Sequence, residues 1–483
     1  MHKRLPGFKF LFGYKKLNVL LFISLLVRLG IFWASKSWQQ EILNHVVLQA
    51  DAVGYHLLAL KILNEFSFGG DSFRTPGYPF FIAVVYFFFG VKPYAVLVVQ
   101  IFVNLFSIVL VYHTARRMFS KAAGMVAAVL FAFEPHNLMY IFSLWSETLF
   151  VGFTCLTVFL IVRAVQDRSS RQLILAGMVL ALTILIRPVL EFYPLAIIGF
   201  LICYFWKSPR HLFTGIAAFL IGVIMLLTPW LLRNYREFNR LQLSSMTGYN
   251  LLVYNASYFE ATQSNMRYEE AVGMYNQELW KQGYKDTLNP DNLPVLPADT
   301  SNPFMKSDRY QELAFSKLRP RFKTYLAEHL KGMVMIHISP GTKIITKTLN
   351  LPTAKLAQND RLHSGIAFYL DYFFTKMYWY ESLATIYMVV FLCFIYLFSL
   401  LTLVKQWKNR NNRLLVLLLL GTAVYFTLIS GILAHTRYRV PSMPFLIIAA
   451  GFAGSSFLTK VHRRFFRRPK KVFGEPDYNK PSL

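Results

Sequence analysis

Ten polar side chains of types that bind anions or move protons are spread along the sequence, and arginine is the commonest type among them. They are Asp51, Tyr55, His56, Arg74, Tyr78, Glu147, Arg187, Arg233, Arg437 and Arg439. Arginine forks match the geometry of phosphate oxygens, whereas a carboxylate can accept a proton from a hydroxyl group. An acid such as Asp51 among several arginines therefore indicates a site that binds an anion while deprotonating another group.

These residues adjoin segments that are long and apolar enough to cross a membrane. The 483-residue sequence is 55% hydrophobic and 17% aromatic, whereas a soluble chain of that size needs more charge to cover its surface. Segments such as residues 212–232 contain no charged residue, and about 20 residues of helix span the ~30 Å hydrocarbon core. Unbroken apolar runs favour helices over alternating barrel strands. The sequence predicts an all-α polytopic integral membrane protein with about 10–11 transmembrane helices.

The formal net charge of +27 is sorted along the chain. Twenty-four Lys and Arg but a single acid, Asp167, fall in six short segments: residues 1–16, 114–121, 163–171, 207–210, 405–413 and 460–471. Residues 233–377 instead hold 18 basic and 13 acidic residues. By the positive-inside rule the six segments and both termini are cytoplasmic, assisted by anionic lipid head groups. Because the basic runs flank hydrophobic spans, we expect no nucleic-acid partner.

This orientation divides the chain into four parts. Residues 1–232 form an N-terminal transmembrane module, with a first outer loop at 36–77. Residues 233–377 form a large extracytoplasmic loop, in which 305–337 and 363–380 are amphipathic enough to lie on the membrane surface. The last two parts are the closing transmembrane helices at 378–460 and a basic cytoplasmic tail at 461–483. Each of the ten polar side chains then lies on the outer side.

Three further points concern the spans. Residues 17–34 are interpreted as a retained first span and not as a removed signal peptide. Because of the break at residues 90–93, the sequence does not decide whether residues 78–90 form a re-entrant or interfacial helix or cross the membrane. The three cysteines all fall in hydrophobic spans, so the sequence predicts no outer disulfide and no CxxC metal site; we expect neither a metal nor a cofactor.

Six short motifs contain the ten polar residues and follow one another along the chain. They are Asp51-x3-Tyr55-His56-x2-Ala59, Phe73-Arg74-Thr75-Pro76-Gly77-Tyr78-Pro79, Ser146-Glu147-Thr148-Leu149-Phe150, Leu185-Ile186-Arg187-Pro188, Thr228-Pro229-Trp230-Leu231-Leu232-Arg233-Asn234 and Arg437-Tyr438-Arg439-Val440-Pro441. In this order they resemble the motifs of the GT-C glycosyltransferases, in particular the bacterial branch of protein-mannosyltransferase-like and aminoarabinose lipid A transferase-like enzymes. Each motif is weak alone. Together they cover most of the chain apart from about residues 250–370.

The resemblance implies a GT-C-like fold in a bacterial inner membrane, with the active site facing the periplasm. It also implies an inverting hexosyl- or pentosyltransferase that takes its sugar from a polyprenyl-phosphate donor. The acceptor would be an extracytoplasmic lipid, glycan or protein. Asp51 would act as the general base on the acceptor hydroxyl. Arg74, with Arg437 or Arg439, would hold the leaving phosphate.

The remaining candidates are expected to bind substrate. Glu147 would contact the acceptor or the sugar, and the arginines at the ends of spans, Arg187 and Arg233, would line the same site. The sequence departs from the aminoarabinose branch at Gly54, because an arginine commonly precedes the tyrosine there. Any phosphate contact at that point must come from elsewhere, such as His56.

Two other functions use the same residues. A transporter or flippase of lipid-linked sugars would grip phosphate with arginines but would have inverted repeats and a midplane site, neither of which the sequence shows. A polysaccharide polymerase or ligase would differ only in its acceptor. The sequence identifies neither the sugar nor the acceptor.

Overall fold

The described part of the chain is mostly helical. A computed structural model describes residues 14–282, 302–354 and 371–466, and these ranges contain no β-strand. Eight of their helices are long and apolar enough to cross a membrane. They are Lys15–Ser35 (α2), Pro93–Met118 (α6), Glu147–Asp167 (α9), Pro188–Phe205 (which includes α11, Tyr193–Phe205), Pro209–Phe238 (α12), Trp379–Gln406 (α21), Arg410–Leu433 (which includes α22, Arg410–Ser430) and Thr436–Val461 (which runs into α23, Met443–Phe466). The prediction of an all-α polytopic membrane protein is confirmed.

Three more apolar segments complete the bundle. Helix α7 (Lys121–Ala132) and the segment Pro135–Phe142, which begins with α8 (Pro135–Met139), meet at a bend of 56°, a geometry that a broken span and a re-entrant loop share. The bend coincides with Pro135, which lacks a backbone N–H and starts a helix more readily than it continues one. Helices α5 (Gly77–Phe89) and α10 (Ser170–Ile186) are apolar but shorter. Length and composition thus support eight or nine spans among the described residues. The expected ten spans include α10, and the expected eleven include α5 as well.

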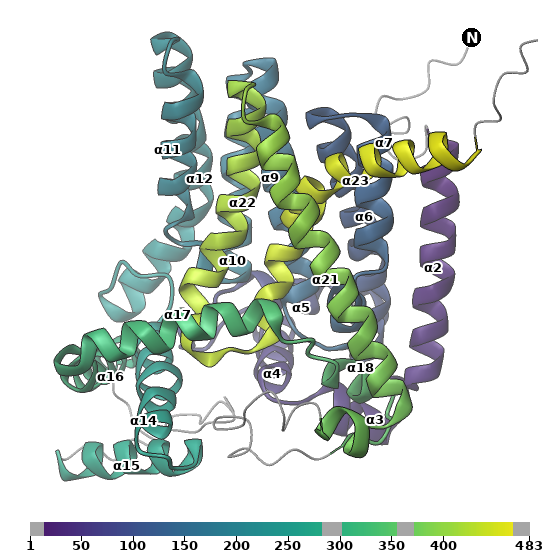
Figure 1. Cartoon of the computed structure of the whole chain (residues 1–483). Coiled ribbons are helices and arrows are strands. Elements are labelled where there is room, and N and C mark those ends of the chain that lie inside the picture. Colours follow the sequence, from purple (N-terminus) through teal and green to yellow (C-terminus); the bar gives the residue numbers. More distant parts are fainter. Residues whose placement is uncertain (1–13, 283–301, 355–370, 467–483) are drawn as a thin grey trace, which may run out of the picture.

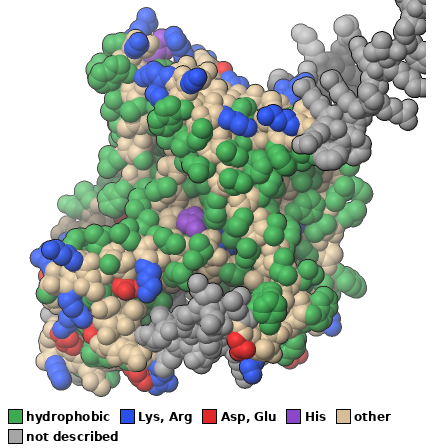
Figure 2. All heavy atoms as spheres, in the orientation of Figure 1, with side chains coloured by type: hydrophobic (Ala, Val, Ile, Leu, Met, Phe, Trp, Pro, Cys, Tyr) green, Lys and Arg blue, Asp and Glu red, His purple; other side chains and the backbone are tan. Residues whose placement is uncertain are grey.

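The long helices stand side by side, as Figure 1 shows. Helix α9 packs on both α6 and α10, α10 packs on α12, and α23 packs on both α7 and α21. Figure 2 shows Lys and Arg side chains gathered at the upper end of the bundle, an apolar surface below them, and a lower lobe where both charges mix. The charges that the sequence sorts along the chain therefore lie at two ends of one bundle.

The lower lobe consists of short helices from the large loop. They are α13 (Met246–Tyr249), η4 (Asn250–Ala256), α14 (Ser257–Gln263), α15 (Tyr268–Lys281), α16 (Pro303–Leu318), α17 (Phe322–Ile338) and α18 (Lys343–Thr348). The lobe has a core of its own, around Leu252, Phe259 and Tyr275. Helix α12 continues six residues past position 232, so the loop begins later than its expected start. Helices α16 and α17 together cover most of the first predicted surface segment, residues 305–337. Residues 363–370 of the second predicted segment fall outside the described ranges.

An arginine lies inside the bundle on α2. Arg28 is 1% exposed, and its Nε and Nη2 donate to Oδ1 of Asn104 on α6 at 3.0 and 2.7 Å. Nη1 donates to the carbonyl of Ser24, and Nη2 also donates to the carbonyl of Ala132 at the end of α7. A buried charge needs such partners. Neutral oxygens on three helices therefore satisfy the guanidinium of Arg28 and join α2 to α6 and α7.

Candidate active site

Arg437 joins two carboxylates that are far apart in the sequence. Its Nη1 donates to Oδ2 of Asp51 at 3.0 Å, and its Nε donates to Oε1 of Glu147. The same Glu147 oxygen accepts a hydrogen bond from Nη1 of Arg187 at 2.6 Å. Nη2 of Arg74 lies 3.9 Å from Oδ1 of Asp51. Five of the ten predicted residues therefore form one cluster of three arginines and two carboxylates.

Asp51 is presented by a strained turn. It is the first residue of α4 (Asp51–Glu65), where a carboxylate is favoured by the positive end of the helix dipole. The preceding Ala50 has φ 50° and ψ −121°, a combination that costs a non-glycine residue energy. The side chain of Asp51 keeps 15% of its surface exposed. The turn thus holds a solvent-accessible carboxylate beside Arg437.

Glu147 and Arg187 are set by helix ends. Glu147 is the first residue of α9, and its side chain is 1% exposed. Arg187 follows α10 in an extended conformation, because the next residue is Pro188 and the residue before a proline is disfavoured in a helix. Gly77 lets α5 approach closely here, since a Cβ on it would lie 2.8 Å from the backbone of Leu185 and Ile186.

The guanidinium of Arg74 occupies the space beside Gly54. A Cβ at position 54 would lie 2.4 Å from Cζ of Arg74, so only glycine leaves room for that group. Arg74 is almost fully buried, and its Cζ lies 5.3 Å from the ring centre of Tyr55 and 5.4 Å from that of Phe73. A guanidinium is therefore present beside position 54, although it comes from the next motif.

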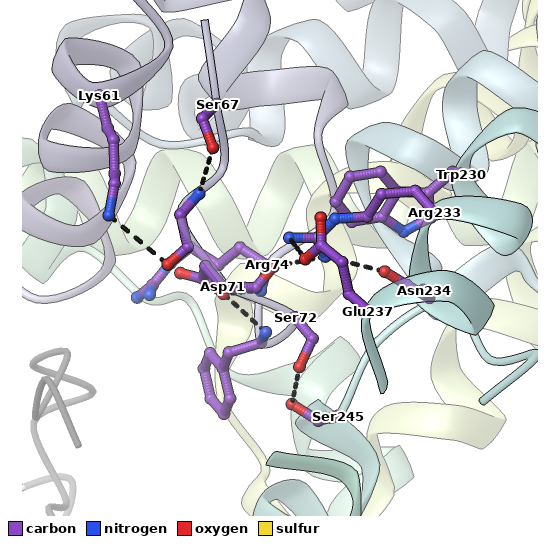
Figure 3. Close-up of polar contacts among 12 residues, drawn as sticks. Lys61, Ser67, Asp71, Ser72, Arg74, Trp230, Arg233, Asn234, Glu237 and Ser245 are labelled. Atoms are coloured by element: carbon purple, nitrogen blue, oxygen red, sulfur yellow. Dashed lines mark hydrogen bonds and ion pairs between the residues drawn. The ribbon is translucent and has the colours of Figure 1, made fainter. Parts of the chain in front are cut away.

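Arg233 holds the loop that carries Arg74 and does not join the cluster. Figure 3 shows Arg233 beside Asp71, with Trp230 and Glu237 around it. Nη1 of Arg233 donates to the backbone carbonyl of Asp71 at 2.9 Å. Oδ1 of Asp71 accepts the backbone N–H groups of Phe73 and Arg74 at 2.7 and 3.2 Å. Arg233 therefore anchors this turn, and the turn aims Arg74.

Of the three aromatic and imidazole candidates, Tyr55 packs against Arg74, whereas Tyr78 and His56 contact other aromatic side chains. Tyr78 is buried, its ring meets Tyr55 edge-on at 4.8 Å, and its hydroxyl donates to Gln100 at 2.9 Å. His56 pairs through Nδ1 with the hydroxyl of Tyr86 at 2.8 Å. Burial raises the pKa of Tyr55 and lowers the pKa of His56. His56 is therefore neutral at pH 7 and adds no charge to the site.

Arg439 lies apart from Asp51 even though only one residue separates it from Arg437. It is fully buried, and its Nη1 donates to the carbonyls of Ile336, His337 and Ser339 at 3.0, 3.0 and 2.8 Å. These carbonyls end α17, so Arg439 caps that helix and ties it to the bundle. Of the two arginines expected at the phosphate, the structure brings only Arg437 to the carboxylates.

Trp145 belongs to the cluster and was not predicted. Cζ of Arg437 lies 4.2 Å from the centre of its ring, and its Nε1 donates to the carbonyl of Gln49 at 3.3 Å. The indole ring of Trp145 therefore packs against Arg437, and its N–H group fixes the backbone at Gln49, two residues before Asp51. Its place next to the Ser146–Phe150 motif was the only signal in the sequence. No group of three or more potential metal ligands occurs within residues 14–282, 302–354 and 371–466.

Comparisons with known proteins bear on both the fold and the family. Residues 74–232 match the family model described as dolichyl-phosphate-mannose-protein mannosyltransferase. The archaeal oligosaccharyltransferase AglB from Archaeoglobus fulgidus, solved with an inhibitory peptide and a dolichol-phosphate, has a TM-score of 0.52 and 15% identity, over 96% of this chain and 53% of that chain. The structure of the same enzyme tethered to an acceptor peptide also has a TM-score of 0.52. Its sequence is 14% identical, and the match covers 93% of this chain and 50% of that chain. AglB is a member of the GT-C superfamily.

The chain has the GT-C fold. This confirms the resemblance that the six motifs indicate, and the matched residues 74–232 include two of them completely and overlap two more. The chain spans about half the length of the oligosaccharyltransferase structures that it matches. ArnT from Cupriavidus metallidurans bound to undecaprenyl phosphate gives 12% identity over 91% of this chain and 78% of that chain, with a TM-score of 0.36, too low to support a shared fold. No curated protein gives a significant sequence match to this chain.

Proposed function

We propose that this protein is an inverting glycosyltransferase that moves a sugar from a polyprenyl-phosphate donor to a hydroxyl group of an extracytoplasmic acceptor. The cluster in which Arg437 bridges Asp51 and Glu147 carries this proposal. With Arg74 and Arg187 it contains three positive and two negative side chains, so an anionic ligand improves its charge balance. The GT-C fold and the family match support the same class of reaction.

In the proposed reaction the acceptor hydroxyl attacks the anomeric carbon from the face opposite the phosphate. Asp51 takes the hydroxyl proton as the new carbon–oxygen bond forms. The bond between the anomeric carbon and the phosphate oxygen breaks, and its electron pair stays on the phosphate. Arg74 and Arg437 stabilise the charge that develops there. One displacement inverts the anomeric centre, and the products are the glycosylated acceptor and the polyprenyl phosphate.

Glu147 has a supporting role in this scheme. Its Oε1 receives both Arg437 and Arg187, while Oε2 is buried without a hydrogen-bond partner among the described residues. A buried carboxylate fixed by two arginines is a rigid anchor. It holds the guanidinium of Arg437 in the position from which Arg437 reaches Asp51.

The test compares Asp51→Asn with Asp308→Asn in cells that lack the native gene. Asp308 is a lobe carboxylate, paired with Arg240 at 2.7 Å, and serves as the matched control. Lipid-linked sugars are measured by mass spectrometry. Loss of a general base costs about 10²–10⁴-fold in turnover, so the Asp51 variant accumulates the polyprenyl-phosphate sugar as the deletion does. The wild type and the Asp308 variant consume it.

A near-normal rate of sugar transfer by purified Asp51→Asn would refute the assignment of the base. Movement of the lipid-linked sugar across the bilayer, with its phosphate bond intact, would instead identify a flippase. Mass analysis of the glycosylated product separates a transferase from a polymerase or ligase, because it identifies the acceptor.

A further inference from the structure

Lys347 lies near the arginine and carboxylate cluster, against the ring of Trp145. It lies on α18, in the part of the chain where the family resemblance is weakest, and its Nζ is 5.6 Å from the ring centre of Trp145. The same indole carries Arg437 at 4.2 Å. Two cations therefore share one aromatic ring, an arrangement in which they repel each other while the ring attracts both.

Helix α18 is firmly placed. Ile344 and Ile345 pack against buried side chains of the bundle, and α18 contacts α8. Just after its end, Nδ2 of Asn350 donates to the carbonyl of Ser35 on α2 at 2.8 Å. The buried hydroxyl of Thr346 accepts a hydrogen bond from Thr353 at 2.8 Å. The packing of α18 therefore fixes the backbone of Lys347 close to the cluster.

The charge of Lys347 is not balanced by the protein that surrounds it. Among the described residues no carboxylate lies within ion-pair distance of its Nζ, whereas Arg437 has two carboxylate partners. Burial, and then the charge of Arg437, lower the pKa of Lys347. A half-buried ammonium without a counter-ion is costly unless an anion joins it. With Lys347 the cluster has four positive and two negative side chains, an excess that a phosphate monoester of charge about −1.5 to −2 would balance.

We propose that Lys347 binds the phosphate of the polyprenyl-phosphate ligand together with Arg437 and Arg74. This assignment rests on the proposed function and adds a phosphate-binding residue from the lower lobe. An ammonium is a compact point charge on a flexible stem, so Lys347 can follow the phosphate as its bond to the sugar breaks. The lower lobe would then contribute directly to donor binding.

Binding of polyprenyl monophosphate, the expected product, tests the assignment without any sugar transfer. The full chain in neutral phosphatidylcholine nanodiscs is titrated with polyprenyl monophosphate, with the uncharged polyprenol, and with phosphatidic acid. Lys347→Met removes the charge but keeps the apolar stem, and Lys347→Arg restores a cation. Lys343→Met removes an exposed lysine from the same helix as the matched control.

Lys347→Met is expected to weaken monophosphate binding about tenfold or more, the scale of one hydrogen bond to a charged group. Lys347→Met should bind polyprenol as tightly as the wild type does, and Lys343→Met should bind the monophosphate as tightly as the wild type does. Lys347→Arg should recover most of the monophosphate affinity. In a transfer assay Lys347→Met should raise the KM for the donor. If Lys347→Met is unstable, as judged by its melting temperature, Lys347→Gln replaces it.

Unchanged monophosphate affinity in a folded Lys347→Met variant would overturn the proposal. An equal loss of phosphatidic acid affinity would overturn it as well, because the lysine would then bind any membrane phosphate. Lys347-dependent binding of the monophosphate without sugar transfer by the wild type would refute the proposed function alone. The two failures are thus distinguishable.

Discussion

Nη1 of Arg437 lies 3.0 Å from Oδ2 of Asp51, although 386 positions separate the two residues in the chain. The contact joins the start of α4 to the turn before the last helix. The pair therefore forms only when the segment before the last helix has packed against the start of α4. The contacts that build the site also join segments of the bundle, so variants of the cluster should affect stability as well as activity.

The bridge of Arg437 to Glu147 should be strongly coupled. Arg437→Met leaves Glu147 buried with one partner fewer, and breaking a buried ion pair costs about 3–5 kcal/mol. Adding Glu147→Gln removes the stranded charge, so the double variant should be more stable than the sum of the single effects. Reversible unfolding in detergent measures these energies. Arg240→Met, at a partly exposed pair, is the control and should cost less than about 1 kcal/mol.

Gly54→Ala should displace Arg74. The new Cβ would overlap the guanidinium at 2.4 Å, so Arg74 must leave its place beside Asp51. We expect a donor KM raised about tenfold, on the scale of one charged contact, while helix content by circular dichroism stays unchanged. Gly273→Ala, on α15 with no atom within 4 Å of its new Cβ, is the control and should be neutral or slightly stabilising. A normal donor KM in Gly54→Ala would show that the site tolerates another position of Arg74.

Arg439→Lys should destabilise the protein without weakening phosphate binding. The planar guanidinium of Arg439 donates to the carbonyls of residues 336, 337 and 339. The compact ammonium of lysine cannot reproduce this geometry. The expected loss is about 1–3 kcal/mol of unfolding free energy. Polyprenyl monophosphate binding in nanodiscs should match the wild type. Weaker binding at unchanged stability would place Arg439 at the ligand instead.

His337 should make the fold sensitive to mild acid. Burial, and then the charge of Arg439, lower the pKa of His337 from 6.5 to about 4. The unfolded chain therefore binds this proton first as the pH falls. The contribution of His337 to stability is complete above pH 6.5 and is lost progressively toward pH 4. His337→Gln should flatten the pH dependence of the unfolding free energy between pH 7 and 5, and equal slopes in both proteins would contradict the assignment.

The sequence was most informative where a single pattern decides the structure. Long apolar runs such as those in α2, α6 and α12 predicted helices, because the bilayer requires internally satisfied backbone groups. The choice between Arg437 and Arg439 could not be made in that way. The two lie in a 3₁₀ segment, Thr436–Ser442, in which about three residues complete a turn, so residues two apart point in different directions. Which direction faces Asp51 depends on packing.

Contacts across the chain were the least predictable. Nothing near Gly54 indicates that Arg74 fills the space beside it, since that space is formed by the fold of two loops. Lys347 was likewise one of 18 basic residues in the large loop, without a motif around it. Its position became apparent only when α18 was seen against Trp145. Residues of this kind are found from distances, because their spacing in sequence carries no periodic signal.

The contact between Arg28 and Asn104 has a consequence for biogenesis. An unpaired arginine at the centre of a membrane helix raises the insertion free energy by about 2.5–3.5 kcal/mol. Helix α2 emerges from the ribosome well before α6, so Arg28 must wait for its amide partner. We therefore expect α2 to remain near the translocon, or in contact with a chaperone, until α6 arrives. Asn104→Leu should prolong that stage and increase degradation of the nascent chain, even though Asn104 is not part of the arginine and carboxylate cluster.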